Sequence, residues 1–330
     1  MPAIKNALYC GDSLDILRNT IPSESIDLCY IDPPFNSKRD YFYNNQGSEE
    51  HAQAFADTWE WEDEASGGYA FITDVRHVKS EKLTIQTVEL IKGLHNVLGK
   101  GSLLAYLISM TLRIAEIHRA LKATGSLYLH CDTTASHYLK LILDSIFCSR
   151  HGRFLNEIIW HYTGGGRAKT YYSKKHDSIF WYAKGKHWTF NADSIRIPYK
   201  KTSGYARSGI TSTSGRHYSP NPLGTVPDTV WDMPIINPLS HERCGYPTQK
   251  PEALLERIIL SASNPGDLVA DFFCGSGTTA VVAERLGRRW IACDKASLAV
   301  AATAKRLGRA AEMRGQGGST PLRGLGQSPN

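Results

Sequence analysis

The chain has 330 residues, of which 42% are hydrophobic and 21% charged, with a formal net charge of +6. This composition is typical of a soluble globular protein with one sizeable core, or one core and a smaller appended lobe. No apolar stretch approaches the about 20 residues of a membrane span, and no secretory signal pattern is visible at the N-terminus, so we expect a cytoplasmic protein with no membrane partner.

The predicted elements alternate between strands and helices along the chain, which indicates an α/β fold. Short apolar runs predict strands at Ala7–Cys10, Ile26–Ile31, Ser126–His130, Glu157–Tyr162, Ser178–Tyr182, Leu268–Phe272 and Trp290–Cys293. Amphipathic segments predict helices at Leu103–Leu121, Ala135–Phe147, Glu252–Ala262, Thr278–Leu286 and Ser297–Leu307. A further helix is expected near Lys82–Val97, inside a long segment that starts polar and acidic at Tyr43.

The charges are distributed unevenly. Residues Gly165–Tyr218 contain eleven Lys or Arg, two acids and ten aromatic residues, whereas residues 49–64 contain seven acids and no Lys or Arg. Each stretch could be a solvated face, and the basic one also suits a polyanionic partner. The seven cysteines stand singly, without a C-x-x-C pair or zinc-ligand spacing, so we expect neither a metal site nor a disulfide.

A glycine loop, Asp271-Phe-Phe-Cys-Gly275-Ser-Gly277-Thr-Thr-Ala280, lies between a predicted strand and a predicted helix. Glycines there permit a tight turn and close approach of a ligand to the backbone. Asp294, at the end of the next predicted strand, could bind two ribose hydroxyls. The loop indicates a nucleoside-containing cofactor, and the alternative is a glycine turn without a ligand. A nicotinamide cofactor is disfavoured, because its loop usually opens a domain and this loop comes late.

A second motif, Asp32-Pro33-Pro34-Phe35, directly follows the apolar run Ile26–Ile31. Two prolines cannot continue a central strand, so the chain leaves the sheet here with a rigid backbone. A carboxylate, a proline carbonyl and an aromatic ring then project from the carboxyl edge of the strand, where open α/β sheets bind ligands. The alternative is a simple strand stop with a buried Phe35.

Together the two motifs resemble the paired signature of the S-adenosylmethionine-dependent amino-methyltransferases. Their order, with DPPF early and the glycine loop late, is similar to that of the beta class of DNA adenine and cytosine amino-methyltransferases. The resemblance extends to Gly11-Asp12, to Tyr246-Pro-Thr-Gln-Lys250-Pro251, and to the segments GSLYLHCD, NEIIWHYTGGG and KKHDSIFWYAK. It implies a Rossmann-like S-adenosylmethionine-dependent methyltransferase fold of the α/β class, circularly permuted, with a smaller target-recognition region.

The resemblance also implies a division of the chain. Residues 1–190 would form the N-terminal part of the catalytic domain, with a helical and acidic insertion at about 44–100. Residues 191–245 would recognise the target, residues 246–310 would complete the cofactor-binding part, and residues 311–330 would be a disordered tail. The implied partner is double-stranded DNA. A homodimer, with the acidic segment 49–64 as a contact, and a cognate restriction endonuclease are further possibilities.

The resemblance assigns roles to individual residues. The Asp32 side chain and the Pro33 carbonyl would accept the two N–H groups of an exocyclic amino group, while Phe35, placed by Pro34, would stack on a flipped-out base. S-adenosyl-L-methionine would be bound by Asp12 at the adenine, Asp294 at the ribose, Thr248 and Lys250 at the carboxylate end, and by loop residues Asp271, Phe273, Gly275, Gly277 and Thr278. Phosphates would be bound by Arg167, Lys169, Lys174, Lys175, Lys200, Lys201 and Arg207.

Some of these roles have structural alternatives. Asp12 could be a helix cap, Lys250 a surface lysine, and Trp231 and the aromatics near Tyr171 could be core residues.

The implied activity is site-specific methylation of adenine N6, because the family usually has Asp rather than Ser at the first position of the tetrapeptide when adenine is the target. Methylation of cytosine N4 is the alternative. An RNA or protein amino-methyltransferase is disfavoured by the permuted motif order. C5-cytosine chemistry is disfavoured because no cysteine follows a proline. An inactive nucleic-acid-binding module would predict loss of Asp32, the prolines or the glycines, and all are present.

Overall fold

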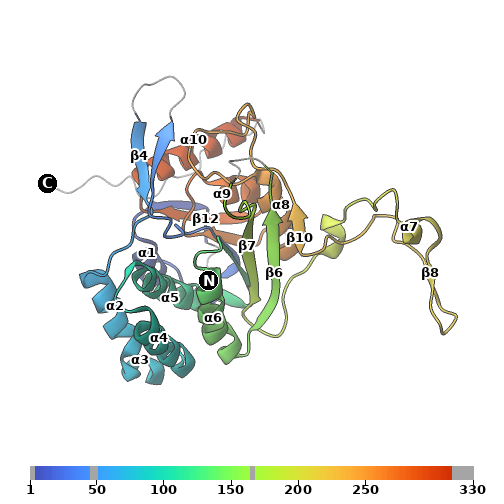
Figure 1. Ribbon diagram of the computed structural model, residues 1–330. Coiled ribbons are helices and arrows are strands. Elements are labelled where there is room, and N and C mark those ends of the chain that lie inside the picture. Colours follow the sequence, from blue (N-terminus) through green and yellow to red (C-terminus); the bar gives the residue numbers. More distant parts are fainter. Residues whose placement is uncertain (1–3, 45–50, 164–167, 314–330) are drawn as a thin grey trace.

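The computed structural model describes residues 4–44, 51–163 and 168–313 and centres on one eight-stranded sheet (Figure 1). All its strands run parallel except β7, which is antiparallel to both neighbours. In spatial order they are β1 (Ala7–Cys10), β12 (Arg289–Asp294), β11 (Leu268–Asp271), β2 (Ile26–Ile31), β5 (Leu121–Cys131), β7 (His176–Ala183), β6 (Arg153–His161) and β10 (Val230–Asp232). Strands from the two ends of the chain are therefore neighbours, with β1 beside β12 at one edge of the sheet and β2 beside β11 inside it.

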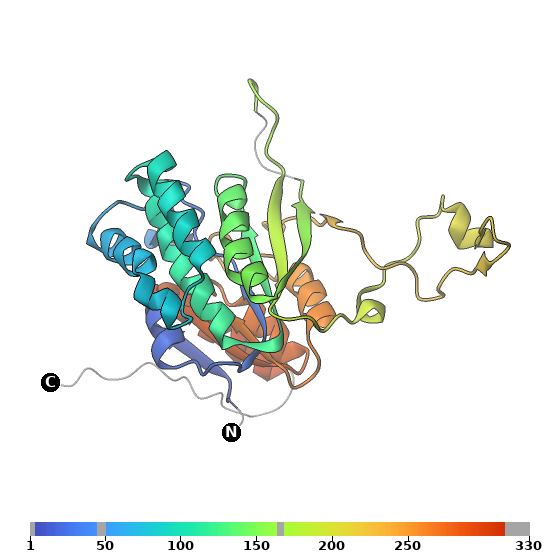
Figure 2. The ribbon, with the colours of Figure 1, turned by 90° about the horizontal axis from the view of Figure 1, so that it is seen from below.

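Helices cover both faces of the sheet (Figure 2). One face carries α1 (Ser13–Asn19), α2 (Asp63–Thr73), α4 (Ile85–Leu98), α5 (Ser102–Ala120) and α6 (Ser136–Phe147), with the short α3 (Val75–Lys79) beside them. The other face carries α8 (Glu252–Ala262), α9 (Thr278–Arg285) and α10 (Ser297–Met313). None of the described helices has the length and apolar character needed to cross a membrane.

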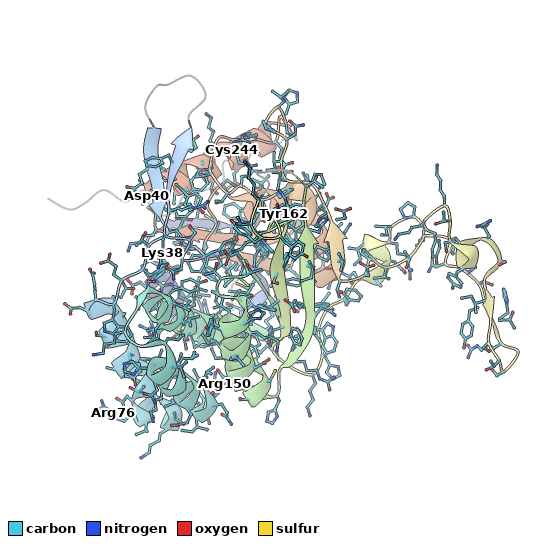
Figure 3. The ribbon with its side chains drawn as sticks, in the orientation of Figure 1. Lys38, Asp40, Arg76, Arg150, Tyr162 and Cys244 are labelled. Atoms are coloured by element: carbon cyan, nitrogen blue, oxygen red, sulfur yellow. The ribbon has the colours of Figure 1, made fainter. Side chains whose placement is uncertain are left out.

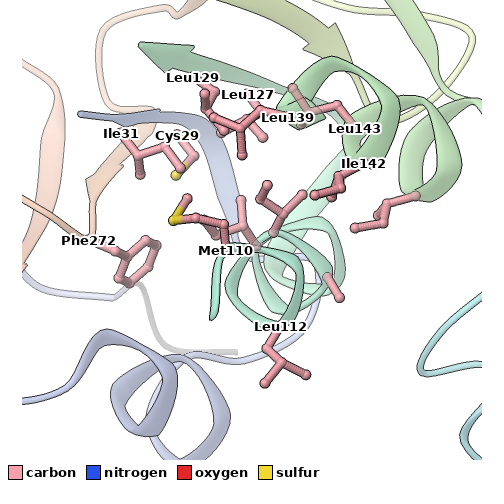
Figure 4. Close-up of a cluster of buried hydrophobic side chains, with 14 of the residues drawn as sticks. Cys29, Ile31, Met110, Leu112, Leu127, Leu129, Leu139, Ile142, Leu143 and Phe272 are labelled. Atoms are coloured by element: carbon pink, nitrogen blue, oxygen red, sulfur yellow. The ribbon is translucent and has the colours of Figure 1, made fainter. Parts of the chain in front are cut away.

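Alternation of side chains along the central strands builds two cores. In β2, Cys29 and Ile31 pack on the α5 side, whereas Leu28 and Tyr30 pack on the α8 side. Successive side chains of a strand point to opposite faces, so strands covered on both faces are apolar throughout. Figure 4 shows the α5-side core, in which Met110 lies against side chains of the neighbouring strands and of α6.

All seven predicted strands and all five predicted helices are confirmed, and the helix expected near Lys82–Val97 is α4. The largest differences in bounds are in α10, which ends six residues after the predicted Leu307, and in β5, which begins five residues before the predicted Ser126. Several short elements were not predicted: α1, α2, α3, α7 (Gly204–Ser208), the hairpin β3 (Asp40–Asn44) and β4 (His51–Ala56), the pair β8 (Ile210–Thr211) and β9 (His217–Tyr218), β10, and the 3-10 turns Cys148–Arg150 and Ala192–Ile195.

The segment 191–245 is only partly separate from the body, which consists of the eight-stranded sheet and the helices on its faces. Asn191 donates hydrogen bonds to Ser261 O from its backbone (2.8 Å) and to Leu260 O from its side chain (3.1 Å), which fixes the start of the segment to α8. Near its end, β10 pairs with β6 and forms the edge of the sheet. Residues 196–229 between them extend away from the body, and we call them the arm (Figures 1 and 2). Of the predicted tail, residues 311–313 end α10, and the rest lies outside the described residues.

Candidate active site

Four strand ends meet at one edge of the sheet and form a cavity. Because β2, β11, β12 and β1 are parallel neighbours, the residues after their carboxyl ends converge there. These residues are Asp32 after β2, the glycine loop after β11, Asp294 at the end of β12, and Asp12 after β1. The cavity has a volume of about 710 Å³, which is in the range of small-molecule and cofactor sites.

The glycine loop turns tightly beneath the cavity. Gly275 has φ +49°, its N–H donates to Asp294 Oδ2 (2.9 Å), and a Cβ there would lie 3.3 Å from the ring of Tyr246. Gly277 has φ +76° and is the N-cap of α9, and a Cβ there would lie 2.5 Å from Thr303 of α10. Gly277 therefore faces α10 and shapes the turn, whereas Gly275, Thr278 and Phe273 line the cavity.

Two carboxylates stand at this loop, of which Asp271 is buried and Asp294 is half-buried. Asp271 accepts hydrogen bonds from the Thr279 hydroxyl (2.6 Å) and the Phe273 N–H (3.0 Å). Burial, with a smaller contribution from the charges of Asp32 and Asp294, raises the pKa of Asp271 to about 7. Burial also raises the pKa of Asp294. Acidic groups held in this way favour a cationic ligand, because its charge would compensate theirs.

Asp12 has both a structural and a cavity position. Its Oδ1 accepts from the Leu14 N–H (2.8 Å), which caps α1, so the helix-cap alternative is confirmed. Its Oδ2 forms an ion pair with buried Arg113 (2.6 Å). Both Asp12 and Arg113 also line the cavity, so capping does not remove Asp12 from the site.

Asp32 follows β2 and lines the cavity with Pro33, Pro34 and Phe35. Its Oδ2 forms an ion pair with Lys250 Nζ. Its Oδ1 is buried and, within the described part of the chain, has no hydrogen-bond partner. The Lys250 side chain is only 11% exposed, so the alternative of a surface lysine is wrong. Thr248, in the left-handed region with φ +60°, also lines the cavity.

A network of polar side chains lies against one face of the Phe35 ring. The Phe35 ring is stacked on His130 with centroids 6.0 Å apart. His130 Nδ1 bonds to the Tyr30 hydroxyl (2.9 Å) and Nε2 to Asp177 Oδ2 (3.0 Å), while the Tyr162 hydroxyl donates to Asp177 Oδ1 (3.2 Å). Burial acts to raise the pKa of Asp177, but the hydrogen bond and charge of His130, the charge of Lys250 and the hydrogen bond from Tyr162 together outweigh it and lower that pKa. Sequence reasoning did not predict these roles, although His130 and Asp177 lie in segments that carry the family resemblance.

The acidic segment 49–64 contributes to the cavity. Of its acids, Asp57, Glu60, Glu62 and Glu64 line it, with Trp59 among them. Asp57 accepts hydrogen bonds from the N–H groups of Phe35, Asn36 and Ser37. This carboxylate was missed in the sequence, where it is one of several acids in a polar stretch. Figure 3 labels Lys38, which lies between the DPPF motif and the hairpin, and Asp40, which is the first residue of the hairpin.

The predicted DNA-binding residues occupy two places. Exposed Lys169 and Lys174, and half-buried Lys175, lie in the loop between β6 and β7, at the same sheet edge as the cavity. Exposed Lys200, Lys201 and Arg207 lie on the arm, which projects from the body (Figure 3). Arg167 lies outside the described residues.

Not every basic residue of this stretch is available to an external partner. Lys184 donates to Leu121 O (2.6 Å), and Arg196 pairs with Asp193 (2.6 Å). The aromatic residues also divide. Trp231 is buried in the core, so the core alternative is confirmed for it, whereas Tyr171 and Tyr172 are 69% and 98% exposed, so that alternative is wrong for them.

The donor set fits the cofactor that the sequence suggests. The cavity combines a glycine whose missing Cβ leaves room beside Tyr246, carboxylates at four strand ends, and the aromatic ring of Phe273. A nucleoside with a cationic tail can be accommodated by such groups. Among the described residues, no cluster of three or more His, Cys, Asp or Glu could hold a metal ion.

Two DNA methyltransferases are similar to this chain in sequence. DNA adenine methyltransferase YhdJ of Escherichia coli K12 is 31% identical over 286 residues, which are 86% of this chain and 76% of that protein. Type II methyltransferase M.HpaI of Haemophilus parainfluenzae is 37% identical over 183 residues, which are 55% of this chain and 52% of that protein.

Solved structures share the fold. The PvuII DNA methyltransferase, named as cytosine-N4-specific, has a TM-score of 0.54 at 17% identity and covers 95% of this chain and 93% of its own. The protein TTHA0409 of Thermus thermophilus, in complex with S-adenosyl-L-methionine, has a TM-score of 0.53 at 17% identity and covers 98% of this chain and 100% of its own. The family model described as DNA methylase matches residues 26–305, a span that includes the DPPF motif, the glycine loop and Asp294. The chain belongs to this N6/N4 methyltransferase family of DNA methylases.

Proposed function

We propose that this DNA methyltransferase transfers a methyl group from S-adenosylmethionine to the N6 amino group of a flipped-out adenine in double-stranded DNA. One observation carries the proposal: the buried, unpartnered Oδ1 of Asp32 stands in the cavity beside the glycine loop. A buried acceptor without a partner is costly in a folded protein, and a ligand N–H would satisfy it. The similarity to a DNA adenine methyltransferase supports adenine as the base.

Asp32 and Pro33 would activate the amino group. The lone pair of an exocyclic nitrogen is delocalised into the ring, so the nitrogen is a weak nucleophile. Acceptance of its two N–H groups by Asp32 Oδ1 and the Pro33 carbonyl would draw it toward tetrahedral geometry and free the lone pair. The Asp32 carboxylate would also stabilise the positive charge that develops on nitrogen. Phe35, supported by His130, would hold the base by stacking.

The cofactor would lie along the sheet edge. S-adenosylmethionine supplies an electrophilic methyl group when bound. Asp12 would contact its adenine, Asp294 its ribose, and the glycine loop with Asp271 its methionine part. Lys250, which pairs with Asp32, and Thr248 also line the cavity and would contact the carboxylate end. The base and the methyl group would thus meet between β2 and β11.

Cytosine N4 is the competing target. Its amino group has the same chemistry, and the PvuII enzyme with the same fold is named as specific for it. Asp at position 32 favours adenine by its usual association in the family. The proposal further assigns phosphate contacts to the β6–β7 loop and the arm, and target recognition to the segment 191–245.

Mass spectrometry of nucleosides tests the proposal. DNA from a methylation-deficient host that expresses the chain should contain N6-methyladenine. The Asp32→Ala variant should give no product while it still binds S-adenosylmethionine, and Asp15→Ala, which removes an exposed aspartate of α1, should behave as the wild type. N4-methylcytosine instead would overturn the choice of adenine and preserve the mechanism. A folded, cofactor-binding protein that modifies neither base would contradict the proposal.

A further inference from the structure

Asp57 has a buried carboxylate, which accepts hydrogen bonds from the last residue of DPPF and from the loop that follows it. It lies directly after β4 and is 2% exposed. Its Oδ1 accepts from the Asn36 N–H (2.7 Å), and its Oδ2 accepts from the N–H groups of Phe35 (3.1 Å) and Ser37 (2.8 Å). Three successive backbone donors therefore converge on one side chain.

The backbone conformation makes this convergence possible. Asn36 adopts a left-handed conformation with φ +60°, and such a residue in a turn can direct consecutive N–H groups to one side. The resulting concavity binds anions, and here the anion belongs to the protein. Hydrogen bonds from an N–H to a carboxylate are stronger than those between neutral groups. Without Asp57, three donors around buried Asn36 would lose their acceptor.

Backbone hydrogen bonds attach the same residue to the chain beyond the motif. The Lys38 N–H donates to Asp57 O (2.9 Å), and the Asp57 N–H donates to Arg39 O (2.9 Å). These bonds continue into the pairing of β3 with β4. The hairpin also contacts another part of the cavity lining, because Ala54 lies in one hydrophobic cluster with Tyr246, which directly precedes the PTQKP turn. Asp57 thus links the DPPF loop to a hairpin that contacts residues next to the PTQKP turn.

We infer that Asp57 is a positioning residue for methyl transfer, which fixes the Phe35 ring and the Asp32 carboxylate relative to the target base. This inference rests on the proposed function. Asp57 orients the loop from one side, while His130 supports the Phe35 ring from the other. A displacement of about 1 Å at a reacting group can reduce the rate about a hundredfold. An enzyme that lacks the Asp57 acceptor would therefore transfer the methyl group slowly even with Asp32 and Phe35 intact.

The Asp57→Asn variant tests the inference. It keeps the size of the side chain but replaces one acceptor oxygen by an NH₂ group, which faces a donor and cannot bond to it. We expect kcat to fall about a hundredfold, with an unchanged Kd for S-adenosylmethionine. Hydrogen exchange should show loss of protection at the amides of residues 35–37. Asp57→Ser, which leaves space for water to accept from these amides, provides a second variant if Asp57→Asn does not fold.

Asp40→Asn is the matched control. Asp40 lies on the same hairpin, is exposed, and bonds to Gln53 (3.1 Å), so its loss should change neither kcat nor the exchange of residues 35–37. Wild-type kcat or retained amide protection in Asp57→Asn would overturn the inference. A loss of kcat that only parallels loss of cofactor binding and of thermal stability would also overturn it, because it indicates a structural role alone. If the wild type methylates no DNA, the proposed function fails, while the exchange experiment still decides whether Asp57 holds the loop.

Discussion

Lys250 Nζ and the Asp32 carboxylate form an ion pair in the cavity, although 218 residues separate them in the chain. Lys250 is also 5.5 Å from the centroid of the Phe35 ring. The PTQKP turn thereby closes over the DPPF motif from the other half of the chain. The pair engages Oδ2 of Asp32 and leaves Oδ1 without a partner among the described residues, so Lys250 determines which oxygen is free.

Removal of Lys250 should destabilise the protein through Asp32. In Lys250→Met the carboxylate keeps its charge and loses its partner, and loss of one member of a buried pair costs about 3 kcal/mol. Urea unfolding of Lys250→Met, Asp32→Asn and the double variant measures the coupling. We expect the double variant to be more stable than the sum of the single effects predicts. Strict additivity would show that the two groups do not interact in solution.

Replacement of Phe35 should weaken the reaction with DNA without affecting the cofactor. Stacking of a base on an aromatic ring contributes about 1–3 kcal/mol, so Phe35→Ala should lower kcat/KM for DNA about tenfold to a hundredfold, while Phe35→Tyr should retain activity. Phe42→Ala, at an exposed aromatic of β3, is the control. Equal losses of DNA and cofactor binding in Phe35→Ala would contradict a role in base stacking.

The central fold was predictable because its strands are apolar on both faces and its helices are amphipathic. The hairpin was not, since β4 reads HAQAFA and lacks β-branched residues. The three-residue strand β10 is too short for a periodic signal. Its place in the sheet depends on pairing with β6, which is distant in the chain.

The site was predictable where a motif stands at a strand end. Asp32, Asp271 and Asp294 needed only the position of their strands. The role of Asp57 depends on the three amides that converge on it, and that of His130 on the ring of Phe35 above it. Such contacts are made by tertiary structure, and the local sequence around each residue does not show them.

Cofactor binding should depend on pH through Asp271. In the folded protein its pKa is about 7, raised mainly by burial, whereas the pKa of an aspartate in an unfolded chain is about 4. The stability that this group contributes is therefore fully present below pH of about 4 and is lost as the pH rises toward 7. A cationic ligand favours the ionised form, so the affinity for S-adenosylmethionine should increase as the pH rises through 7.

Calorimetry in buffers of different ionisation enthalpy checks this expectation. Binding below pH of about 7 should release a proton from Asp271. In Asp271→Asn the release should disappear and the affinity should be lower and less dependent on pH. Proton release that persists in this variant would assign it to another group, for which Asp294→Asn is the next test, since burial raises that pKa as well.

The basic residues of the arm should contribute to DNA affinity through phosphates. Binding of phosphates by Lys and Arg depends on salt, and removal of one such side chain reduces the slope of log K against log salt by about one. The triple variant Lys200→Ala, Lys201→Ala and Arg207→Ala should therefore bind all DNA sequences more weakly and with a smaller slope. Lys79→Ala with Lys82→Ala, at exposed residues near α3 and far from the arm, should bind as the wild type (Figure 1). If the triple variant binds DNA as the wild type does, the phosphate contacts belong to the β6–β7 loop, where Lys169 and Lys174 lie at the sheet edge of the cavity.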